Sequence, residues 1–248
     1  MYTNMKSLAI IPAYNEDINV LKGVAKETKK HVDGVLVIDD GSKQKVKLNV
    51  KVLRNEPNMG KGKSLLRGFD YALKNKYDVA ITLDADGEHK AHQIPEFLNK
   101  IKKYDYVVGQ RMSYRTLERR FINSFATFWF TLLIPGIKDM YCGFRAIKLS
   151  AFKKMEFKGA RFELEPEMLL ECIKNNISIG YQEVETDPLA KTNFKFSDYL
   201  RTNELYDKWV LKNHRCIKAN FIKKTFLIVS ALIGLILTKV LKWVLRKS

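Results

Sequence analysis

The sequence predicts an α/β protein with a mostly parallel β-sheet covered by helices on both faces. Short apolar runs alternate with segments of helical periodicity along the first 110 residues, which is typical of parallel strands connected by helices. The strand-like runs are apolar at consecutive positions, as expected for strands that are buried on both faces. Polar clusters follow three of these runs, and ligands bind beyond the carboxyl ends of the strands in such sheets.

Each expected element has a local signal in the sequence. The strands are short apolar runs, such as SLAIIPA at residues 7–13 and VAITL at residues 79–83. The first helix has Asp17 as its expected cap, and the second carries Leu65 and Phe69 at helical spacing. The expected strands are residues 7–13, 35–38, 50–53, 79–83, 106–109 and 177–184. The expected helices are residues 17–30, 61–74, 91–102 and 163–175.

The pattern changes after residue 110. Four arginines fall within residues 111–120, and residues 121–134 are rich in large apolar side chains before Pro135 and Gly136 end the segment. We expect an amphipathic helix with a basic start. Two alternatives fit this helix, one in the protein core and one on a membrane surface.

The last fifth of the chain differs from the rest in charge and hydropathy. The whole chain has a formal net charge of +17, and residues 201–248 contain 11 Lys and Arg against 2 Asp and Glu. Such an excess attracts nucleic acid or an anionic lipid surface. Residues 226–238 carry no charge, but they are too few to span a membrane alone because a span needs about 20 residues.

Three alternatives remain for this apolar segment. Extended to residue 245, with Lys239 and Lys242 reaching toward one interface, it is long enough to span a membrane. The other two alternatives are an interfacial anchor and a helix buried in the core. We therefore expect two parts, a domain over residues 1–200 and a basic, amphipathic and apolar membrane anchor over residues 201–248.

The strongest chemical signal is Asp84-Ala85-Asp86, which directly follows an apolar strand. Two carboxylates separated by one residue can approach the same cation where the backbone bends. Hard cations such as Mg²⁺ bind one or two carboxylates together with substrate phosphates, which a nucleotide diphosphate supplies. Glu88 and His89 follow at once and offer a further ligand or a supporting contact.

Other site types fit the sequence less well. The GKGKS stretch at residues 60–64 lacks the leading glycine of a phosphate-binding P-loop, because Pro57 stands at that position. His89 and His92 have no third nitrogen or sulfur ligand nearby for a zinc site. Three widely spaced cysteines give no disulfide framework.

Several motifs in order resemble a known family. They are PAYNE at residues 12–16, IDDGS at 38–42, NMGKG at 58–62, DADG at 84–87 and GQR at 109–111. This order resembles the inverting glycosyltransferases of family 2, which have the Rossmann-like GT-A fold. Two later stretches, DMYCGFR at 139–145 and FELEPE at 162–167, are similar to the polyprenyl-phosphate sugar transferases such as dolichol-phosphate mannose synthases.

The resemblance implies a nucleotide-sugar donor and a divalent cation, Mg²⁺ or Mn²⁺. The implied metal ligands are Asp84, Asp86 and Glu88. The implied donor-binding residues are Pro12, Tyr14, Glu16, Asp39, Asp40, Lys61 and Asp84. Relatives often carry an arginine- and glycine-containing loop near residues 187–197, where this chain instead has Lys191 and Lys195 as candidate phosphate ligands.

The resemblance also implies a polyprenyl (dolichyl) phosphate acceptor. Arg111, Arg120 and Ser124 correspond to the contacts with the acceptor phosphate. Arginine forks bind phosphate with two hydrogen bonds, and residues 120 and 124 share one helical face. The implied catalytic residues are Asp86, Arg111, Arg145 and Asp139.

A phosphate acceptor simplifies the expected chemistry. A phosphate monoester is already ionised near neutral pH, so it can attack the anomeric carbon without a general base. If a base exists, Asp139 or Glu163 is the candidate, and Arg145 could instead assist the phosphates. A second hypothesis is transfer to a polysaccharide or lipid hydroxyl, which requires a base. A third is a non-catalytic membrane or nucleic-acid binding protein, against which the intact Asp84 and Asp86 argue.

The charge distribution predicts the location of the protein. Lys223 and Lys224 precede the apolar segment on the side of the catalytic domain, and positive residues favour the cytoplasmic side of a membrane. We therefore expect a membrane-associated enzyme with its catalytic domain on the cytoplasmic face. We expect no specific binding to nucleic acid.

Overall fold

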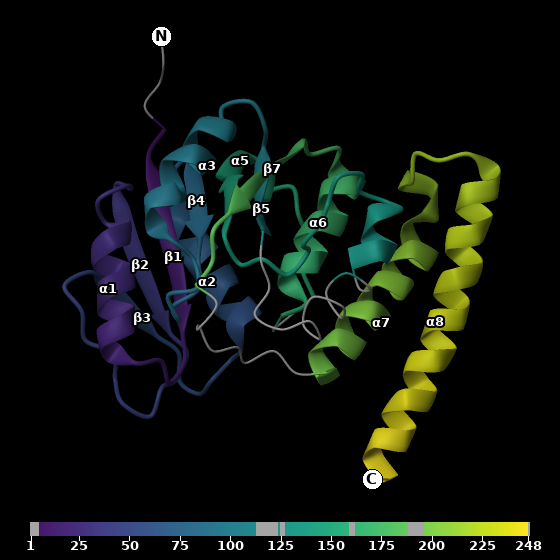
Figure 1. Cartoon of the computed structure of the whole chain (residues 1–248), viewed down its shortest axis with the longest axis horizontal. Helices are drawn as coiled ribbons and strands as arrows, with labels where there is room; N and C mark the ends of the chain where they lie inside the picture. The colour runs from purple at the N-terminus through teal and green to yellow at the C-terminus, as the bar shows by residue number, and fades with distance from the viewer. Residues whose placement is uncertain (1–4, 113–123, 125–126, 159–161, 188–195, 248) are drawn as a thin grey trace.

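A seven-stranded sheet forms the centre of the protein in the computed structural model (Figure 1). The structure describes residues 5–112, 124, 127–158, 162–187 and 196–247. The strands lie in the order β3-β2-β1-β4-β6-β5-β7, and β6 runs antiparallel to both of its neighbours while the other pairs are parallel. The strands are β1 Ser7–Ala13, β2 Gly34–Asp39, β3 Lys51–Arg54, β4 Val79–Thr82, β5 Tyr106–Arg111, β6 Arg145–Lys148 and β7 Ile179–Val184.

Helices cover both faces of the sheet, as the apolar strands predict. Alternate residues of β1 point to opposite faces, so that Ile10 contributes to one core and Ile11 to the other. The first core includes Phe69 of α2, and the second includes Leu21 of α1 and Phe97 of α3. The helices are α1 Ile18–Thr28, α2 Lys61–Lys74, α3 Ile94–Lys100, α5 Leu149–Phe152, α6 Leu164–Asn175, α7 Phe196–Asn213 and α8 Phe221–Lys247, with short 3-10 turns at Ala91–Gln93 and His214–Cys216.

The expected strands and helices are confirmed, with ends that differ by a few residues. The second helix has the bounds that its periodicity predicts, residues 61–74. Asp17 caps α1, since its side chain accepts hydrogen bonds from the backbone N–H groups of Asn19 and Val20. The expected helix over residues 91–102 begins as a 3-10 turn and continues as α3.

Two elements were not predicted, the antiparallel strand β6 and the short helix α5. β6 has only four residues, RAIK, and it lies between β4 and β5 because it pairs with both. A short strand with a charged residue at each end gives little periodic signal. Its insertion separates β4 from β5 in a sheet that is otherwise parallel.

The segment 121–134 is helical at the described residues 124 and 127–131. Phe130 and Ile134 are buried in the core, whereas Phe128 is 53% exposed. The described part of this helix therefore packs mainly on the protein, as the core alternative predicts, and leaves one large apolar side chain exposed.

The C-terminal part forms two helices that lie side by side, α7 next to the sheet domain and α8 on its outer side (Figure 1). Residues 221–243 belong to a helix that is long and apolar enough to cross a membrane, and its most apolar 18-residue stretch has a mean hydropathy of 2.0. Only 17% of this stretch is buried in the protein. A helix buried in the core, one of the three alternatives, is therefore wrong for this segment.

Candidate active site

The ends of four parallel strands bring the predicted polar clusters to one edge of the sheet. Ala13 at the end of β1 pairs with Asp39 at the end of β2. The backbone N–H of Leu83, directly before Asp84, donates to the carbonyl oxygen of Ile10 in β1. Arg111 ends β5, which points the same way. The predicted convergence of the three polar clusters, at residues 14–16, 39–40 and 84–86, therefore follows from strand register, and Arg111 lies at the same edge.

Asp84 lies in an ion-pair cluster. Its Oδ1 atom is 2.6 Å from Nζ of Lys61, and the same Nζ is 2.8 Å from Oε1 of Glu165. Burial would lower the pKa of Lys61, but the charges of the two acids outweigh it and raise that pKa above its ordinary value. Burial would likewise raise the pKa of Asp84, but Lys61 holds it below its usual range. Lys61 is thus a cation and Asp84 an anion at neutral pH.

The stretch 84–88, which follows β4, contains three carboxylates, those of Asp84, Asp86 and Glu88. Ligand atoms of Asp84, Glu88 and His89 lie within 4.8 Å of one another. The Oδ1 atom of Asp86 accepts a hydrogen bond of 2.9 Å from the backbone N–H of Glu88. Burial and the negative charge of Asp84 raise the pKa of Asp86. The cluster therefore gathers carboxylate oxygens at one place, and such ligands suit Mg²⁺ or Mn²⁺.

His89 is a buried side chain that contacts the backbone of this cluster. Its Nδ1 atom accepts the backbone N–H of Asp84 at 3.2 Å, and its Nε2 atom is 3.7 Å from Sγ of Cys142. Burial lowers the pKa of His89, so the ring is neutral and its Nδ1 lone pair is used by the backbone. The carboxylates are therefore the groups that could hold a cation, and His89 supports them through the backbone of Asp84.

A loop over residues 139–143 crosses the sheet edge next to Asp84. A Cβ atom added to Gly143 would lie 2.5 Å from Oδ2 of Asp84, so only glycine allows this approach. The hydroxyl of Thr82 donates to the carbonyl oxygen of Gly143 at 2.7 Å. Arg145 is buried beneath the loop and donates to the carbonyl oxygens of Met140, Cys142 and Glu165 and to the hydroxyl of Tyr106.

The structure therefore places Arg145 as a support of the loop. Its guanidinium is 2% exposed and is surrounded by backbone carbonyl groups. The predicted assistance to phosphates would need a group that faces the open edge, which this side chain does not.

Arg111 connects the acceptor side of the predicted site with the metal side. It forms two hydrogen bonds with Asp139, of 2.5 and 3.0 Å, and one of 3.3 Å with Glu88. Burial would raise the pKa of Asp139, but Arg111 lowers it below its ordinary value. A buried carboxylate with a lowered pKa is a poor general base. The arrangement thus disfavours Asp139 as a base.

Asp39 and Asp40 are both nearly inaccessible, at 1% and 3% exposed. Asp39 accepts from the backbone N–H of Ser42 at 2.9 Å and from Arg54 at 2.5 Å. Burial would raise the pKa of Asp39, but these hydrogen bonds outweigh it and lower that pKa. Asp40 accepts from the side chain of Asn55 and from the backbone N–H groups of residues 59 and 60. Both acids therefore shape the predicted donor-binding loops through internal contacts.

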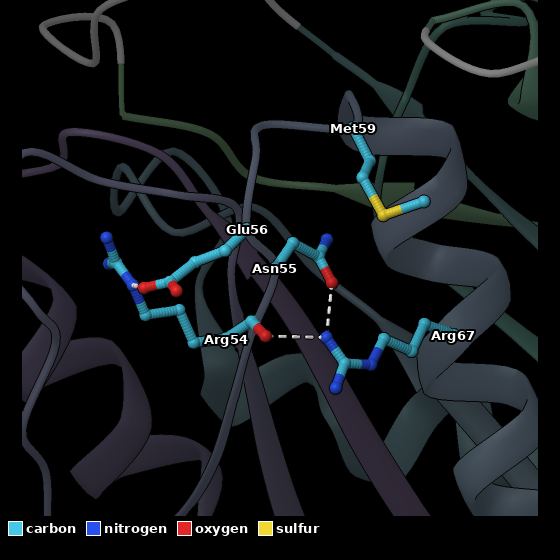
Figure 2. A pocket seen from close by; sticks show the side chains of 5 residues that line it. All are labelled: Arg54, Asn55, Glu56, Met59 and Arg67. Atoms are coloured by element: carbon cyan, nitrogen blue, oxygen red, sulfur yellow. Dashed lines mark hydrogen bonds and ion pairs between the residues drawn. The ribbon is translucent and has the colours of Figure 1, made fainter.

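A shallow pocket lies beside these loops, between the end of β3 and the start of α2 (Figure 2). Arg67 of α2 donates to the carbonyl oxygen of Arg54 and to Oδ1 of Asn55, and Arg54 pairs with Glu56. Met59, which is 44% exposed, also lines the pocket. These contacts fix the loop over residues 55–60 that leads into Lys61.

The remaining predicted residues follow the end of β1, lie in the segment after β5, or fall outside the described part. Pro12 is half-buried at the end of β1, Tyr14 is 45% exposed, and Glu16 follows just before α1. Ser124 is helical and exposed. Arg120, Lys191 and Lys195 lie outside the described residues.

Sequence reasoning missed four contributors to the site. Glu165 holds Lys61, Arg54 holds Asp39, Gly143 makes room for Asp84, and Thr82 anchors the loop. Glu165 and Gly143 lay within stretches that the resemblance used, but neither had a role assigned. Arg54 and Thr82 gave no signal, because their partners are distant in sequence.

Comparison with known proteins shows which family the chain resembles. Residues 8–155 match the family described as Glycosyl transferase family 2. An uncharacterized protein of Methanocaldococcus jannaschii is 35% identical, over 73% of this chain and 87% of that protein. The UDP-N-acetylglucosamine–dolichyl-phosphate N-acetylglucosaminyltransferase of Methanococcus voltae is 28% identical, over 71% of this chain and 84% of its own length.

A solved structure has a similar fold. Glucosyl-3-phosphoglycerate synthase from Mycobacterium tuberculosis, crystallised with Mn²⁺, uridine diphosphate and glucosyl-3-phosphoglycerate, superposes with a TM-score of 0.66. The match covers 86% of this chain and 80% of that chain at 14% sequence identity. The similarity supports the predicted GT-A architecture of the sheet and its helices.

Proposed function

The chain belongs to glycosyl transferase family 2, and from this premise we propose that it transfers a sugar from a nucleotide-sugar to a polyprenyl phosphate at a membrane surface. The observation that carries the proposal is the convergence of Asp84, Glu88 and His89 beside Lys61 at the sheet edge. Asp86 joins this cluster through its hydrogen bond with the backbone N–H of Glu88. The archaeal relative that is named as acting on dolichyl phosphate supports this class of acceptor.

The proposed roles follow from the charges at the edge. Asp84, Asp86 and Glu88 would hold Mg²⁺ or Mn²⁺, which would stabilise the negative charge on the departing diphosphate. Lys61 would bind the same diphosphate, and its position as a buried cation next to Asp84 supports this role. Pro12, Tyr14 and the loops shaped by Asp39 and Asp40 would accommodate the nucleoside.

A phosphate acceptor agrees with the absence of a suitable base at Asp139. In the proposed step, an oxygen of the ionised acceptor phosphate forms a bond to the anomeric carbon while the bond to the donor diphosphate breaks, with inversion. The acceptor has no proton to lose, so the lowered pKa of Asp139 is no obstacle. Arg111 adds positive charge on the acceptor side, and Arg120 and Ser124 are proposed to complete the phosphate contacts. Transfer to a hydroxyl would need a base, which Asp139 does not supply in this geometry.

The C-terminal region supports the membrane part of the proposal. α8 is apolar and largely exposed, and basic residues surround it. We propose that it attaches the enzyme to the cytoplasmic face of a membrane, where a polyprenyl phosphate is accessible.

The test is a transfer assay with purified full-length protein in detergent and Mg²⁺ or Mn²⁺. Radiolabelled GDP-mannose, UDP-glucose and UDP-N-acetylglucosamine are each incubated with and without a polyprenyl phosphate. We expect label to enter the lipid phase only when the phosphate is present. The variant Asp86→Ala is expected to lose this activity, and Asp70→Ala, which removes an exposed carboxylate from α2, is the matched control.

The outcomes separate the hypotheses. Binding of a donor without labelling of lipid would contradict the acceptor assignment and favour a hydroxyl acceptor. Failure to bind any of the donors would contradict the proposed enzyme activity itself. Equal loss of activity in the Asp70 control would mean that the loss in Asp86→Ala does not report on the site.

A further inference from the structure

The helix α8 touches the rest of the described protein along one stripe. Leu227 and Ala231 are fully buried and Thr238 is 5% exposed, all at spacings that repeat on one face of a helix. Gly234 belongs to the same stripe, and a Cβ atom there would collide with the carboxylate of Asp207 in α7. Small side chains therefore let α7 and α8 approach closely (Figure 1).

The opposite side of α8 is an exposed apolar arc. At about 100° per residue, its members point roughly opposite to the buried stripe. The exposed fractions along it range from 78% at Ile222 to 48% at Val229. The arc consists of Ile222, Phe226, Val229, Ile233, Ile236, Val240 and Trp243.

Lys223, Lys224 and Lys242 lie outside this arc, on the two flanks of the buried stripe. By the same helical spacing, Lys224 and Lys242 lie on one flank and Lys223 on the other, and Lys239 lies at the edge of the arc. Lys242 forms an ion pair with Glu204 of α7. Between residues 226 and 243 the helix thus has an apolar side and a side bordered by positive charge, which is the pattern of helices that lie in a membrane interface.

The charges on the neighbouring helix α7 indicate whether α8 spans a membrane or lies in its interface. α7 lies along α8 and carries charged side chains that include Glu204, Lys208 and Lys212. A charged side chain at the centre of a bilayer costs at least about 2.5 kcal/mol, so α7 cannot enter the hydrocarbon beside α8. With the two helices packed as in this structure, α8 cannot stand across a bilayer.

We propose that α8 lies in the plane of the membrane interface, with its apolar arc in the lipid and α7 on its protein side. The arc runs over about 30 Å, and an interfacial helix of this kind enters the lipid by roughly 5–10 Å. Anionic headgroups are the matching partner, because residues 201–248 carry 11 Lys and Arg against 2 Asp and Glu. The inference rests on the membrane part of the proposed function and specifies its geometry.

Depth measurements on vesicles test this geometry. Cys216 is the exposed cysteine, so Cys216→Ser gives a background in which Cys142 and Cys172 are buried. Single cysteines are then introduced in the full-length protein by Ile222→Cys, Val229→Cys, Ile236→Cys and Val240→Cys, and by Lys239→Cys at the edge of the arc. Each is given a fluorescent label, and quenching is measured with nitroxide lipids in vesicles of phosphatidylcholine and phosphatidylglycerol.

An in-plane helix predicts the same shallow depth at the four positions of the arc and a shallower label at residue 239. A helix that spans the bilayer predicts a graded depth, with the label at residue 229 or 236 near the centre, and this result would overturn the proposal. If the protein does not bind vesicles and instead forms dimers through the arc, the proposal is also overturned, because a second copy then covers α8.

A charge variant gives a second, independent measurement. Ile233→Glu in the arc is expected to weaken vesicle binding at least tenfold, since it removes an apolar anchor and adds a negative charge. The matched control Gln44→Glu adds the same charge at an exposed loop of the sheet domain and is expected to leave binding unchanged. Equal binding of the two variants would refute the role of the arc. Uniform depth without sugar transfer would contradict only the proposed enzymatic function.

Discussion

The substitution Gly143→Ala tests the proposed role of Asp84 without removing any charged group. In the structure, an added Cβ atom at position 143 would lie 2.5, 2.8 and 2.9 Å from Oδ2, Oδ1 and Cγ of Asp84. Non-bonded carbon contacts are favourable at about 3.5 Å or more, so the carboxylate must move by about 1 Å. The loop itself is held by Thr82 and Arg145, so that the side chain of Asp84 is the part that can give way.

The expected effect on activity is larger than the effect on stability. A displacement of about 1 Å in a catalytic group can lower a reaction rate about 100-fold. Overpacking by one methyl group costs about 1–3 kcal/mol of unfolding free energy, which a folded domain tolerates. We therefore expect a transfer rate about 100-fold below wild type, a weaker apparent affinity for Mn²⁺ and a cooperative thermal transition. Sugar transfer, Mn²⁺ titration and thermal unfolding measure these three quantities.

Gly23→Ala is the matched control. Gly23 lies in α1, and a Cβ atom there would meet no other atom within 4 Å. This variant should retain wild-type activity and gain about 0.5–1 kcal/mol of stability, since alanine is favoured over glycine in a helix. Wild-type transfer and Mn²⁺ affinity in Gly143→Ala would refute the reasoning, because Asp84 would then tolerate the displacement and could not be a tightly placed ligand.

Three further predictions concern positions away from the cation ligands. Asp40→Asn should lower stability by about 1.5–3 kcal/mol, because a charged acceptor of two backbone N–H groups is lost, and should weaken donor binding in calorimetry. Asp17→Ala should cost about 1 kcal/mol in chemical unfolding and leave transfer unchanged, and a loss of transfer would contradict a purely capping role. Burial and Glu204 raise the pKa of Asp207 to about 7 from an ordinary 3.8, so its contribution to stability is complete below about pH 4 and is lost as the pH rises through 7. The melting temperature of wild type relative to Asp207→Asn should therefore fall between pH 5 and pH 8, and a constant difference would refute this.

The parts of the fold that the sequence predicts are those with local causes. α2 has its predicted bounds because its apolar residues recur at helical spacing over four turns. The N-terminal end of α1 follows from one capping side chain, Asp17. β6 was missed because its place depends on pairing with β4 and β5, which are about 65 and 40 residues earlier in the chain.

The position of the site was predictable, but its internal contacts were not. The carboxyl ends of parallel strands must meet at one edge, so Asp39 and Asp84 follow from the order of strands and helices. The contact between Arg111 and Asp139 spans 28 residues, and nothing in the sequence pairs them. The alternative of Asp139 as a base therefore stayed open until the structure placed it against an arginine.

The missed strand β6 explains how the two halves of the site are held together. It begins at Arg145 and follows directly after the loop over residues 139–143, so its antiparallel pairing with β4 returns this loop across the active edge. One end of the loop, Asp139, binds Arg111 on the proposed acceptor side, and the other end, Gly143, packs against Asp84 on the proposed donor side. Three residues of backbone join these two ends, and Arg145 fixes them with hydrogen bonds to the carbonyl oxygens of Met140 and Cys142. An all-parallel sheet would need a helical crossover at this point and could not place one short loop against both partners.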